Sequence, residues 1–146
     1  MATAGQSLIS TPNTPMKIIL FKSSDDGKTW NAGEDITSQI YGAQCKVPTR
    51  MSWYAAFVTS GNGLQLSTGR IIFVINVREN KQTGITTFKN YALYSDDGGK
   101  TLFVSKNGPV NDLGGNESKI VELVDGRLLM STRLNSGNKR MHSYSS

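Results

Sequence analysis

Short apolar runs separated by turn-forming residues make up most of this chain, and no stretch keeps the 3.6-residue period of a long helix. The first run, 16–23 (MKIILFKS), predicts a strand, and residues 29–31 start the strand that returns beside it. Residues 1–15 are rich in Ser, Thr and Pro and are predicted as loop, and 33–52 as a long connection. Many short strands joined by turns are typical of an all-β protein.

Seven further strands follow in two groups, the first of four and the second of three. We predict them at 64–66, 70–78, 87–95, 100–105, 119–123, 127–133 and 139–145. Four antiparallel strands joined by short turns make one blade of a β-propeller. The chain is therefore predicted to hold one whole blade and parts of two others, with a β-sandwich as the alternative fold.

One eight-residue motif occurs twice, as SSDDGKTW at 23–30 and as SDDGGKTL at 95–102. A third copy begins at Tyr144 and is truncated at Ser145, before its Asp, so the chain reads as an internal fragment. Each full copy falls between the third and fourth strands of a group, and a repeat at that place favours a propeller over a sandwich.

The residue types of the motif predict a tight turn. Short Ser, Asp and Thr side chains hydrogen-bond the backbone of such turns, and the glycines supply positive φ angles. We therefore interpret Asp25 and Asp97 as structural groups rather than acid/base catalysts. The last residues of the two copies, Trp30 and Leu102, are expected to fold back into the core.

Composition and charge exclude several classes of function. The 146 residues carry a formal net charge of +5, but Lys and Arg are scattered and form no stripe with aromatics, which argues against nucleic acid as a partner. The single Cys45 has no companions for a disulfide or a metal site, and no cofactor is predicted. No apolar run reaches the length of a membrane span.

A charged pair stands out near the C-terminal end. Val124-Asp125-Gly126 has the form of a three-residue hairpin loop closed by a glycine bulge, and in that register Glu117 lies opposite Arg133. A two-residue turn would place them on opposite faces. The pair is either an ordinary cross-strand ion pair or part of a site, because the first strand of a blade lines the channel of a propeller.

At this point the chain resembles a known family. The repeated motif is similar to the Asp-box, or BNR repeat, of the bacterial-type exo-α-sialidases (neuraminidases), whose catalytic domains are six-bladed β-propellers built of four-stranded blades. A second resemblance lies in the segment GNESKIVEL at 115–123, which is followed by DGRLL at 125–129 and by Arg133. It is similar to a segment of the family in which a Glu, the letters VEL, a DG turn, two Leu and an Arg follow one another. The resemblance covers about 17–146 and implies two to three blades.

The resemblance implies roles for three residues. Glu117 matches the glutamate that activates a tyrosine nucleophile, Arg133 matches one of three arginines that bind the carboxylate of sialic acid, and Gln65 would lie near the sugar. Physical chemistry agrees, because the anomeric carbon of sialic acid bears a carboxylate that would repel a carboxylate nucleophile. An arginine fork binds such a group in a bidentate manner.

Other groups of the family's site have no match. The first arginine and the acid/base aspartate would lie upstream of the first Asp-box, and the third arginine and the tyrosine would follow the last residue. None of the five tyrosines, Tyr41, Tyr54, Tyr91, Tyr94 and Tyr144, matches the nucleophile. The aromatic residues Trp53, Tyr54 and Phe57 either wall a sugar pocket or, as we prefer, pack in the core.

The sequence thus predicts a loop at 1–15 and a partial sialidase propeller at 16–146. The implied function is that of a retaining glycosidase that cleaves terminal sialic acids from glycoconjugates, or of an incomplete fragment of one, with sialylated glycans as partners and a secreted or cell-surface location. The alternative is a non-catalytic Asp-box propeller that binds carbohydrate or protein. No obligate protein partner is inferred.

Overall fold

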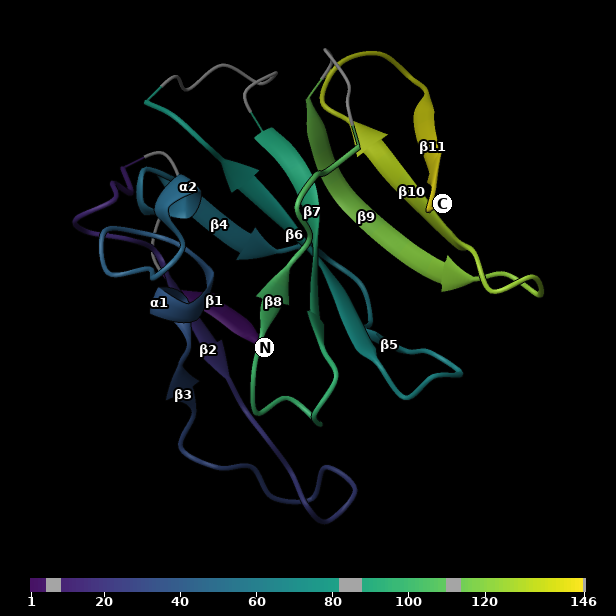
Figure 1. Ribbon diagram of the computed structural model, residues 1–146, viewed down its shortest axis with the longest axis horizontal. Coiled ribbons are helices and arrows are strands. Elements are labelled where there is room, and N and C mark those ends of the chain that lie inside the picture. The colour runs from purple at the N-terminus through teal and green to yellow at the C-terminus, as the bar shows by residue number, and fades with distance from the viewer. Residues whose placement is uncertain (5–8, 82–87, 110–113, 146) are drawn as a thin grey trace.

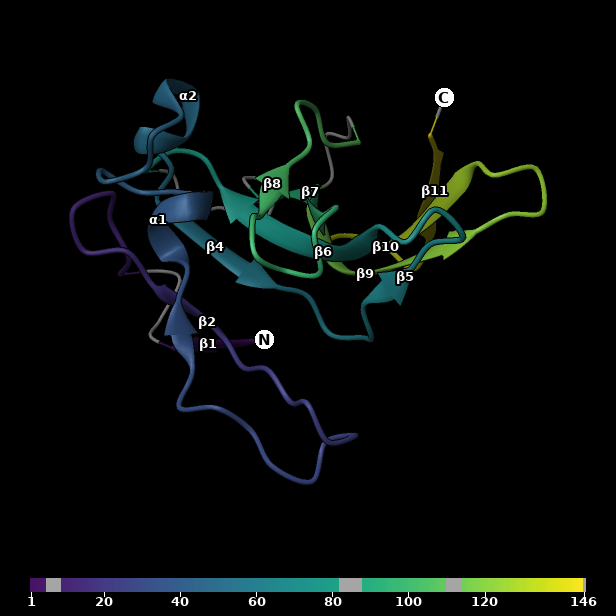
Figure 2. The ribbon, with the colours of Figure 1, turned by 60° about the horizontal axis from the view of Figure 1, so that its bottom comes forward.

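The computed structural model describes residues 1–4, 9–81, 88–109 and 114–145, and within these ranges it contains three antiparallel β-sheets and two short helices. The sheets follow one another in chain order, from the purple and blue first sheet through the teal and green second sheet to the yellow third sheet (Figure 1). A second view also shows the first and third sheets on opposite sides of the molecule, with the second between them (Figure 2).

The first sheet consists of β1 (Ala2–Ala4), β2 (Lys17–Leu20) and β3 (Glu34–Asp35), in the order β1-β2-β3. Alternation along β2 buries Ile18 and Leu20 and leaves Lys17 exposed. The prediction of loop for residues 1–15 is wrong at β1, because three residues there pair with β2. The returning strand begins at β3, later than predicted.

The second sheet is a complete four-position blade. It contains β4 (Ala55–Val58), β5 (Leu64–Gln65), β6 (Ile71–Arg78), β7 (Phe88–Ser95) and β8 (Phe103–Val104). Both β4 and β5 pair with the same edge of β6, so they form one interrupted inner strand. The sequence predicted only the β5 part of it. The first residue of the strand predicted at 87–95 lies outside the described residues.

The third sheet consists of β9 (Gly115–Glu122), β10 (Leu128–Leu134) and β11 (Arg140–Tyr144), in the order β11-β10-β9. The three strands predicted here are confirmed, although β9 begins four residues earlier than the predicted 119. Residue 146, the last of the chain, lies outside the described residues, so the third copy of the motif is described only through Ser145.

Two helices, α1 (Thr37–Ile40) and α2 (Pro48–Met51), interrupt the segment 33–52 that was predicted as connection. Each is a single turn of four residues, too short to give a periodic pattern. Pro48 starts α2 at a position where a helix needs no backbone donor. Ile40 of α1 is fully buried, so the connection packs onto the core rather than crossing the surface.

The apolar core lies between the first and second sheets. Its members come from β2, from α1 and the residues on either side of it, from the start of the blade at 53–56, from β6 and β7, and from the second Asp-box turn. They are Ile18, Leu20, Ile36, Ile40, Tyr41, Trp53, Ala56, Ile75, Val77, Tyr91, Leu93 and Leu102. Arg78, at the end of β6, is only 1% exposed. Its Nη2 donates to Ser10 O at 2.9 Å, and its guanidinium lies 5.3 Å from the ring centre of Tyr54.

A polar network joins the second sheet to the third. The side chains of Asn76 and Asn90, on facing positions of β6 and β7, are buried and hydrogen-bonded to each other at 2.5 Å. Asn76 Nδ2 also donates to Gly115 O at 2.8 Å, and Asn90 Nδ2 to Asn116 O at 2.9 Å. Asn90 further contacts the buried hydroxyl groups of the third sheet, on Ser118 and Thr132. Burial of amides is favourable only when they are paired in this way.

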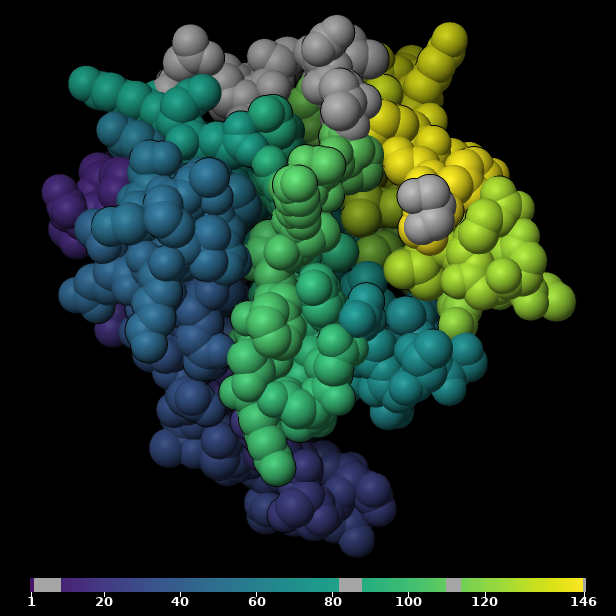
Figure 3. Space-filling view, in the orientation of Figure 1, coloured from purple at the N-terminus to yellow at the C-terminus, as the bar shows by residue number. Residues whose placement is uncertain are grey.

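The surface is hollowed between the second and third sheets, where green and yellow segments meet in the space-filling view (Figure 3). This groove of about 390 Å³ is lined by apolar side chains that include Ile72, Ala92, Met130 and Tyr144. Polar contacts join the two sheets at both ends of β9, from Asn90 to Asn116 and Ser118 near its start and from Ser67 to Glu122 at its end.

The two Asp-box turns adopt the predicted hydrogen-bonded form. In the first, Asp25 accepts from Thr29 N at 2.9 Å and from Thr29 Oγ1 at 2.6 Å. In the second, Asp97 accepts from Thr101 N at 2.8 Å. Gly27 and Gly99 have φ angles of +82° and +83°, which favour glycine. The structural role of both aspartates is thus supported.

The last residues of the two motifs differ in burial. Leu102 is 6% exposed and belongs to the core, as expected, whereas Trp30 is 61% exposed. The expectation for Trp30 is wrong because the first turn extends beyond its short strands (Figure 1). Its indole Nε1 instead donates to Gly27 O at 3.0 Å, within the turn.

Removal of the Asp25 carboxylate is expected to lower the thermal midpoint by a few degrees. Hydrogen bonds, foremost from Thr29 Oγ1, lower the pKa of Asp25 to about 2 from the ordinary 3.8. A carboxyl group with a lowered native pKa stabilises the fold above about pH 4 and loses this effect as the pH falls towards 2. Asp25→Ala should therefore have a lower thermal midpoint than the parent at pH 7. Between pH 4 and 2, the midpoint of Asp25→Ala should fall less than that of the parent.

The matched control is Asp26→Asn, which removes a charge from the same turn without removing the Thr29 acceptor. Scanning calorimetry across pH measures all three proteins. Equal midpoints for Asp25→Ala and Asp26→Asn at pH 7 would contradict the structural role of Asp25.

Candidate functional site

The candidate site lies at the end of the sheets opposite to the Asp-box turns. Both turns are at the lower edge of Figure 1, whereas β9 begins and β10 ends at the upper edge. Glu117 is near the start of β9, and Arg133 is near the end of β10. Both therefore lie at the open end of their hairpin.

The hairpin has the predicted register. Leu123 N donates to Arg127 O at 2.8 Å, and Gly126, with φ +83°, closes a three-residue loop. Leu128 lies opposite Glu122, and the pairing continues in step until Thr132 lies opposite Ser118. This confirms the register on which the pairing of Glu117 with Arg133 depended.

A β-bulge follows at the open end. Ser118 lies opposite Thr132, but Gly115 lies opposite Leu134, so two residues of β9, Asn116 and Glu117, share the single partner Arg133. Bulges occur often beside active sites, where they redirect a side chain. The sequence carried no signal for the bulge, because a register shift depends on what both strands contact.

Glu117 and Arg133 form an ion pair on the outer face of the third sheet. Arg133 Nη1 lies 3.2 Å from Glu117 Oε2, and the two side chains are 55% and 51% exposed. Their neighbours Thr132 and Ser118 point inward and are buried. An ion pair this exposed contributes little to stability, typically about 0–1 kcal/mol.

A second arginine lies directly beside the pair. Arg140 on β11 faces Arg133 across the β10–β11 ladder. Its Nε donates to Ser131 Oγ at 2.9 Å and its Nη2 to Ser131 O at 3.0 Å. This corner of the sheet thus presents two guanidinium groups and one carboxylate, a net positive charge that favours an anion.

Gln65 is not brought to this corner. It pairs with Ile71 at the end of the second sheet that carries the Asp-box turn, and its Nε2 donates to Gly69 O at 3.4 Å. Ser67, two residues further on, is hydrogen-bonded to Glu122 at the far end of β9 from Glu117. The placement of Gln65 beside the sugar, which the family resemblance implied, gains no support from this geometry.

The three aromatic candidates pack against protein. Trp53 is 7% exposed and its ring lies 5.0 Å from that of Tyr91, so it belongs to the core as preferred. Tyr54 is half-buried under the guanidinium of Arg78, and Phe57 is half-buried at 6.2 Å from the ring of Phe88.

A tyrosine and a glutamate do meet in this chain, but away from Glu117. The hydroxyl of Tyr91 donates to Glu79, which is also bound by Lys89 Nζ at 2.7 Å. Burial, and secondly Glu79, raise the pKa of Tyr91 far above its ordinary value. This hydroxyl is therefore held protonated, and the pair is structural. No spacing in the sequence predicts this pair, since Glu79 directly follows β6 and Tyr91 lies on β7.

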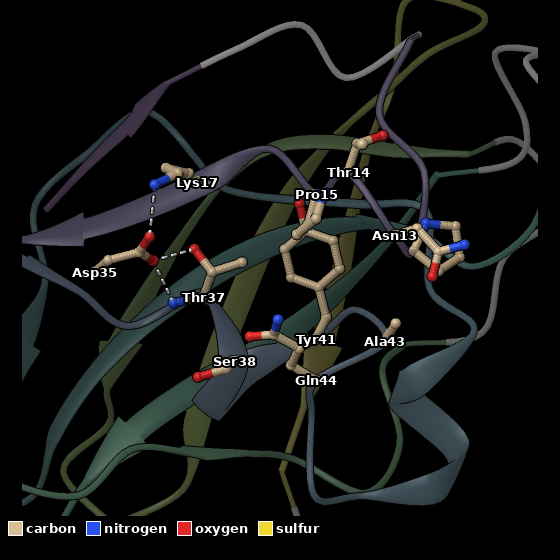
Figure 4. A pocket seen from close by; sticks show the side chains of 11 residues that line it. Asn13, Thr14, Pro15, Lys17, Asp35, Thr37, Ser38, Tyr41, Ala43 and Gln44 are labelled. Atoms are coloured by element: carbon tan, nitrogen blue, oxygen red, sulfur yellow. Dashed lines mark hydrogen bonds and ion pairs between the residues drawn. The ribbon is translucent and has the colours of Figure 1, made fainter.

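A cavity of about 740 Å³ lies beside the first sheet, between α1 and the segment that leads into β2 (Figure 4). Asp35 pairs there with Lys17 Nζ at 3.1 Å and accepts from Thr37 Oγ1 at 2.6 Å, a contact that foremost lowers the pKa of Asp35. The Tyr41 ring lies against Pro15. None of Glu117, Arg133 or Gln65 lines this cavity, and its two charged residues, Lys17 and Asp35, are paired with each other.

Comparison with known proteins adds a family match. The model of the BNR repeat-like domain matches residues 2–146. The chain is 32% identical over 131 residues to a sialidase of Bacteroides fragilis (strain YCH46), covering 88% of this chain and 21% of that protein. It is 31% identical over 124 residues to a sialidase of Paraclostridium sordellii, covering 84% of this chain and 28% of that protein. The chain thus spans less than a third of the length of these relatives.

Solved structures show the same fold. The Hadza microbial sialidase Hz136 matches 97% of this chain and 26% of its own, with a TM-score of 0.76 and 24% identity. The intramolecular trans-sialidase from Ruminococcus gnavus matches 91% of this chain and 24% of its own, with a TM-score of 0.66 and 20% identity. The three sheets are therefore blades of a sialidase-type β-propeller, as predicted. No helix in the described ranges has the length and apolarity to span a membrane.

Proposed function

Because the chain belongs to the family of BNR repeat-like domains, we propose that it supplies two groups of the sialic acid site of an exo-α-sialidase. Arg133 binds the sugar carboxylate, and Glu117 activates a tyrosine nucleophile that another part of the protein contributes. The observation that carries the proposal is the exposed ion pair of Glu117 with Arg133, at the end of the hairpin opposite to the Asp-box turns.

The chemistry of the two groups suits this reaction. The guanidinium of Arg133 offers parallel N–H donors that match both oxygens of a carboxylate. The Glu117 carboxylate beside it accepts the proton of the tyrosine hydroxyl as the phenolic oxygen attacks the anomeric carbon. A neutral tyrosine approaches the sugar without repulsion from its carboxylate, and the leaving sugar oxygen takes a proton from a separate acid.

Binding of N-acetylneuraminate to the isotopically labelled 146-residue chain tests the first role. We expect millimolar binding, seen as shifts of the Arg133 guanidinium signals in NMR spectra, because one arginine of several is present. Arg133→Ala should abolish the binding. Arg127→Ala, which removes a guanidinium bound to Asp125 at the opposite end of the hairpin, should leave it unchanged.

The methyl ester of the same sugar is the matched ligand control, since it keeps the shape and loses the charge. Equal shifts with the acid and the ester, or shifts that persist in Arg133→Ala, would contradict a carboxylate site at Arg133. Hydrolysis is not expected from this chain alone, and turnover of a fluorogenic sialoside by it would show that Glu117 acts with a nucleophile from within these residues.

A further inference from the structure

The β-bulge at the start of β9 is closed by two asparagine side chains. Asn116 Nδ2 donates to Asn135 Oδ1 at 2.6 Å, and Asn135 Nδ2 donates to Gly115 O at 3.2 Å. Asn135 N also donates to Gly114 O at 3.2 Å. The side chain of Asn135 therefore links the end of β10 to the bulged residues of β9.

The same amides satisfy the backbone groups that the bulge takes out of the ladder. Glu117 N donates to Asn116 Oδ1 at 2.9 Å instead of to β10. Asn116 O accepts from Asn90 Nδ2 of the second sheet and from Ser118 Oγ. An unpaired backbone group here would be costly, so the amide contacts make the bulge the stable arrangement.

The geometry points to Asn135 as a positioning residue for the pair of Glu117 and Arg133. Asn135 orients the Asn116 amide, the Asn116 amide holds the backbone N–H of Glu117, and the bulge directs Glu117 toward Arg133, the single residue opposite. The use of this pair in a sugar site rests on the proposed function. The inference that Asn135 sets the geometry of the pair does not rest on it.

The alternative is that Asn135 only adds stability. Its contacts with residues 114–116 lie at the open end of the hairpin, where strands fray first, and the ladder between Ser118 and Glu122 does not involve it. A positioning role therefore predicts a local effect at Glu117 and Arg133, and a purely stabilising role predicts an effect spread along β9.

Amide hydrogen exchange in the full chain separates the two roles without any sugar. In Asn135→Ala we expect exchange at the Glu117 amide to rise by about tenfold or more, while that of Ile120, which pairs with Met130 in the middle of β9, stays within about twofold. Asn135→Asp keeps an oxygen that accepts from Asn116 Nδ2 and should restore the protection of Glu117.

A second readout reports on Arg133. In the parent chain, Glu117→Gln should shift the Arg133 guanidinium signals, because the ion pair is lost. In the Asn135→Ala background the same substitution should produce less than about half of that shift. Unchanged exchange at Glu117, equal increases at Glu117 and Ile120, or an undiminished response of Arg133 would each overturn the positioning role.

Binding of N-acetylneuraminate by the same variants keeps this inference distinct from the proposed function. If the parent chain binds the sugar, Asn135→Ala should weaken binding by about fivefold or more. Asn135→Asp is measured only by amide exchange, because its added negative charge would itself oppose the binding of an anion. If the parent chain does not bind, the proposed function fails, and the exchange measurements still decide whether Asn135 positions the pair.

Discussion

Glu117→Gln is expected to lower kcat by about 10²–10⁴-fold in a protein that carries the remaining blades, because the substitution keeps the size of the side chain and removes the base. A chimera provides such a protein: residues 2–146 replace the equivalent fifth of the Bacteroides fragilis sialidase, with which the chain shares 32% identity. Release of a fluorogenic group from a sialoside measures the rate.

The matched control for this experiment lies on the same strand. Glu122→Gln changes the same residue type at the far end of β9, where the carboxylate accepts hydrogen bonds from Ser67 at the Asp-box end of the sheet. It should leave kcat within about twofold. Full activity of the Glu117→Gln chimera, or a folded parent chimera with no activity, would contradict the proposed function. If the parent chimera binds the sugar but does not turn it over, the result would favour the alternative function, a non-catalytic propeller that binds carbohydrate.

Asn90→Ala is expected to lower the free energy of unfolding by about 3 kcal/mol, the largest loss of stability that we predict for a single polar side chain. Asn90 is 2% exposed and its amide serves both sheets at once. Truncation leaves Asn76, Asn116 O and the Ser118 hydroxyl each with one partner fewer, in a place that water reaches poorly. Urea denaturation followed by circular dichroism gives the difference.

Asn138→Ala is the control, since Asn138 is an exposed residue of the loop between β10 and β11. It should change the free energy of unfolding by no more than about 0.5 kcal/mol. If Asn90→Ala proves as mild as Asn138→Ala, the buried amides do not hold the second and third sheets together. If hydrogen exchange rises at β9 and β10 while β6 stays protected, the network stabilises the third sheet and not the second.

Local features of the chain could be predicted because their physics is local. The Asp-box turns follow from Ser, Asp and Thr side chains that bond their own backbone, and from glycines at positive φ. The register of the β9–β10 hairpin follows from a three-residue loop that ends in Gly126, and this register placed Glu117 opposite Arg133. On the short strand β2, alternation of buried and exposed positions places Ile18 and Leu20 in the core.

Other features depend on partners far away in the sequence. β4 reads as Ala-Ala-Phe-Val, a weak strand pattern, and becomes a strand because β6 offers it a free edge. The bulge depends on Asn135 reaching across to Asn116, and the burial of Arg78 depends on Ser10 O, which comes from a distant segment. Trp30 occupies the same motif position as Leu102, but it is exposed because the first turn extends beyond its sheet.

The all-β class, the turns, the repeat and the register of the β9–β10 hairpin could be predicted from the sequence, since each rests on turn chemistry and hydrogen bonds within a few tens of residues. Three features required the folded structure: the inner strand made of β4 and β5, the asparagine-closed bulge at which Glu117 meets Arg133, and the position of Gln65 at the Asp-box end. These depend on packing between sheets, where the gain from burying a group is set by neighbours that no local pattern specifies.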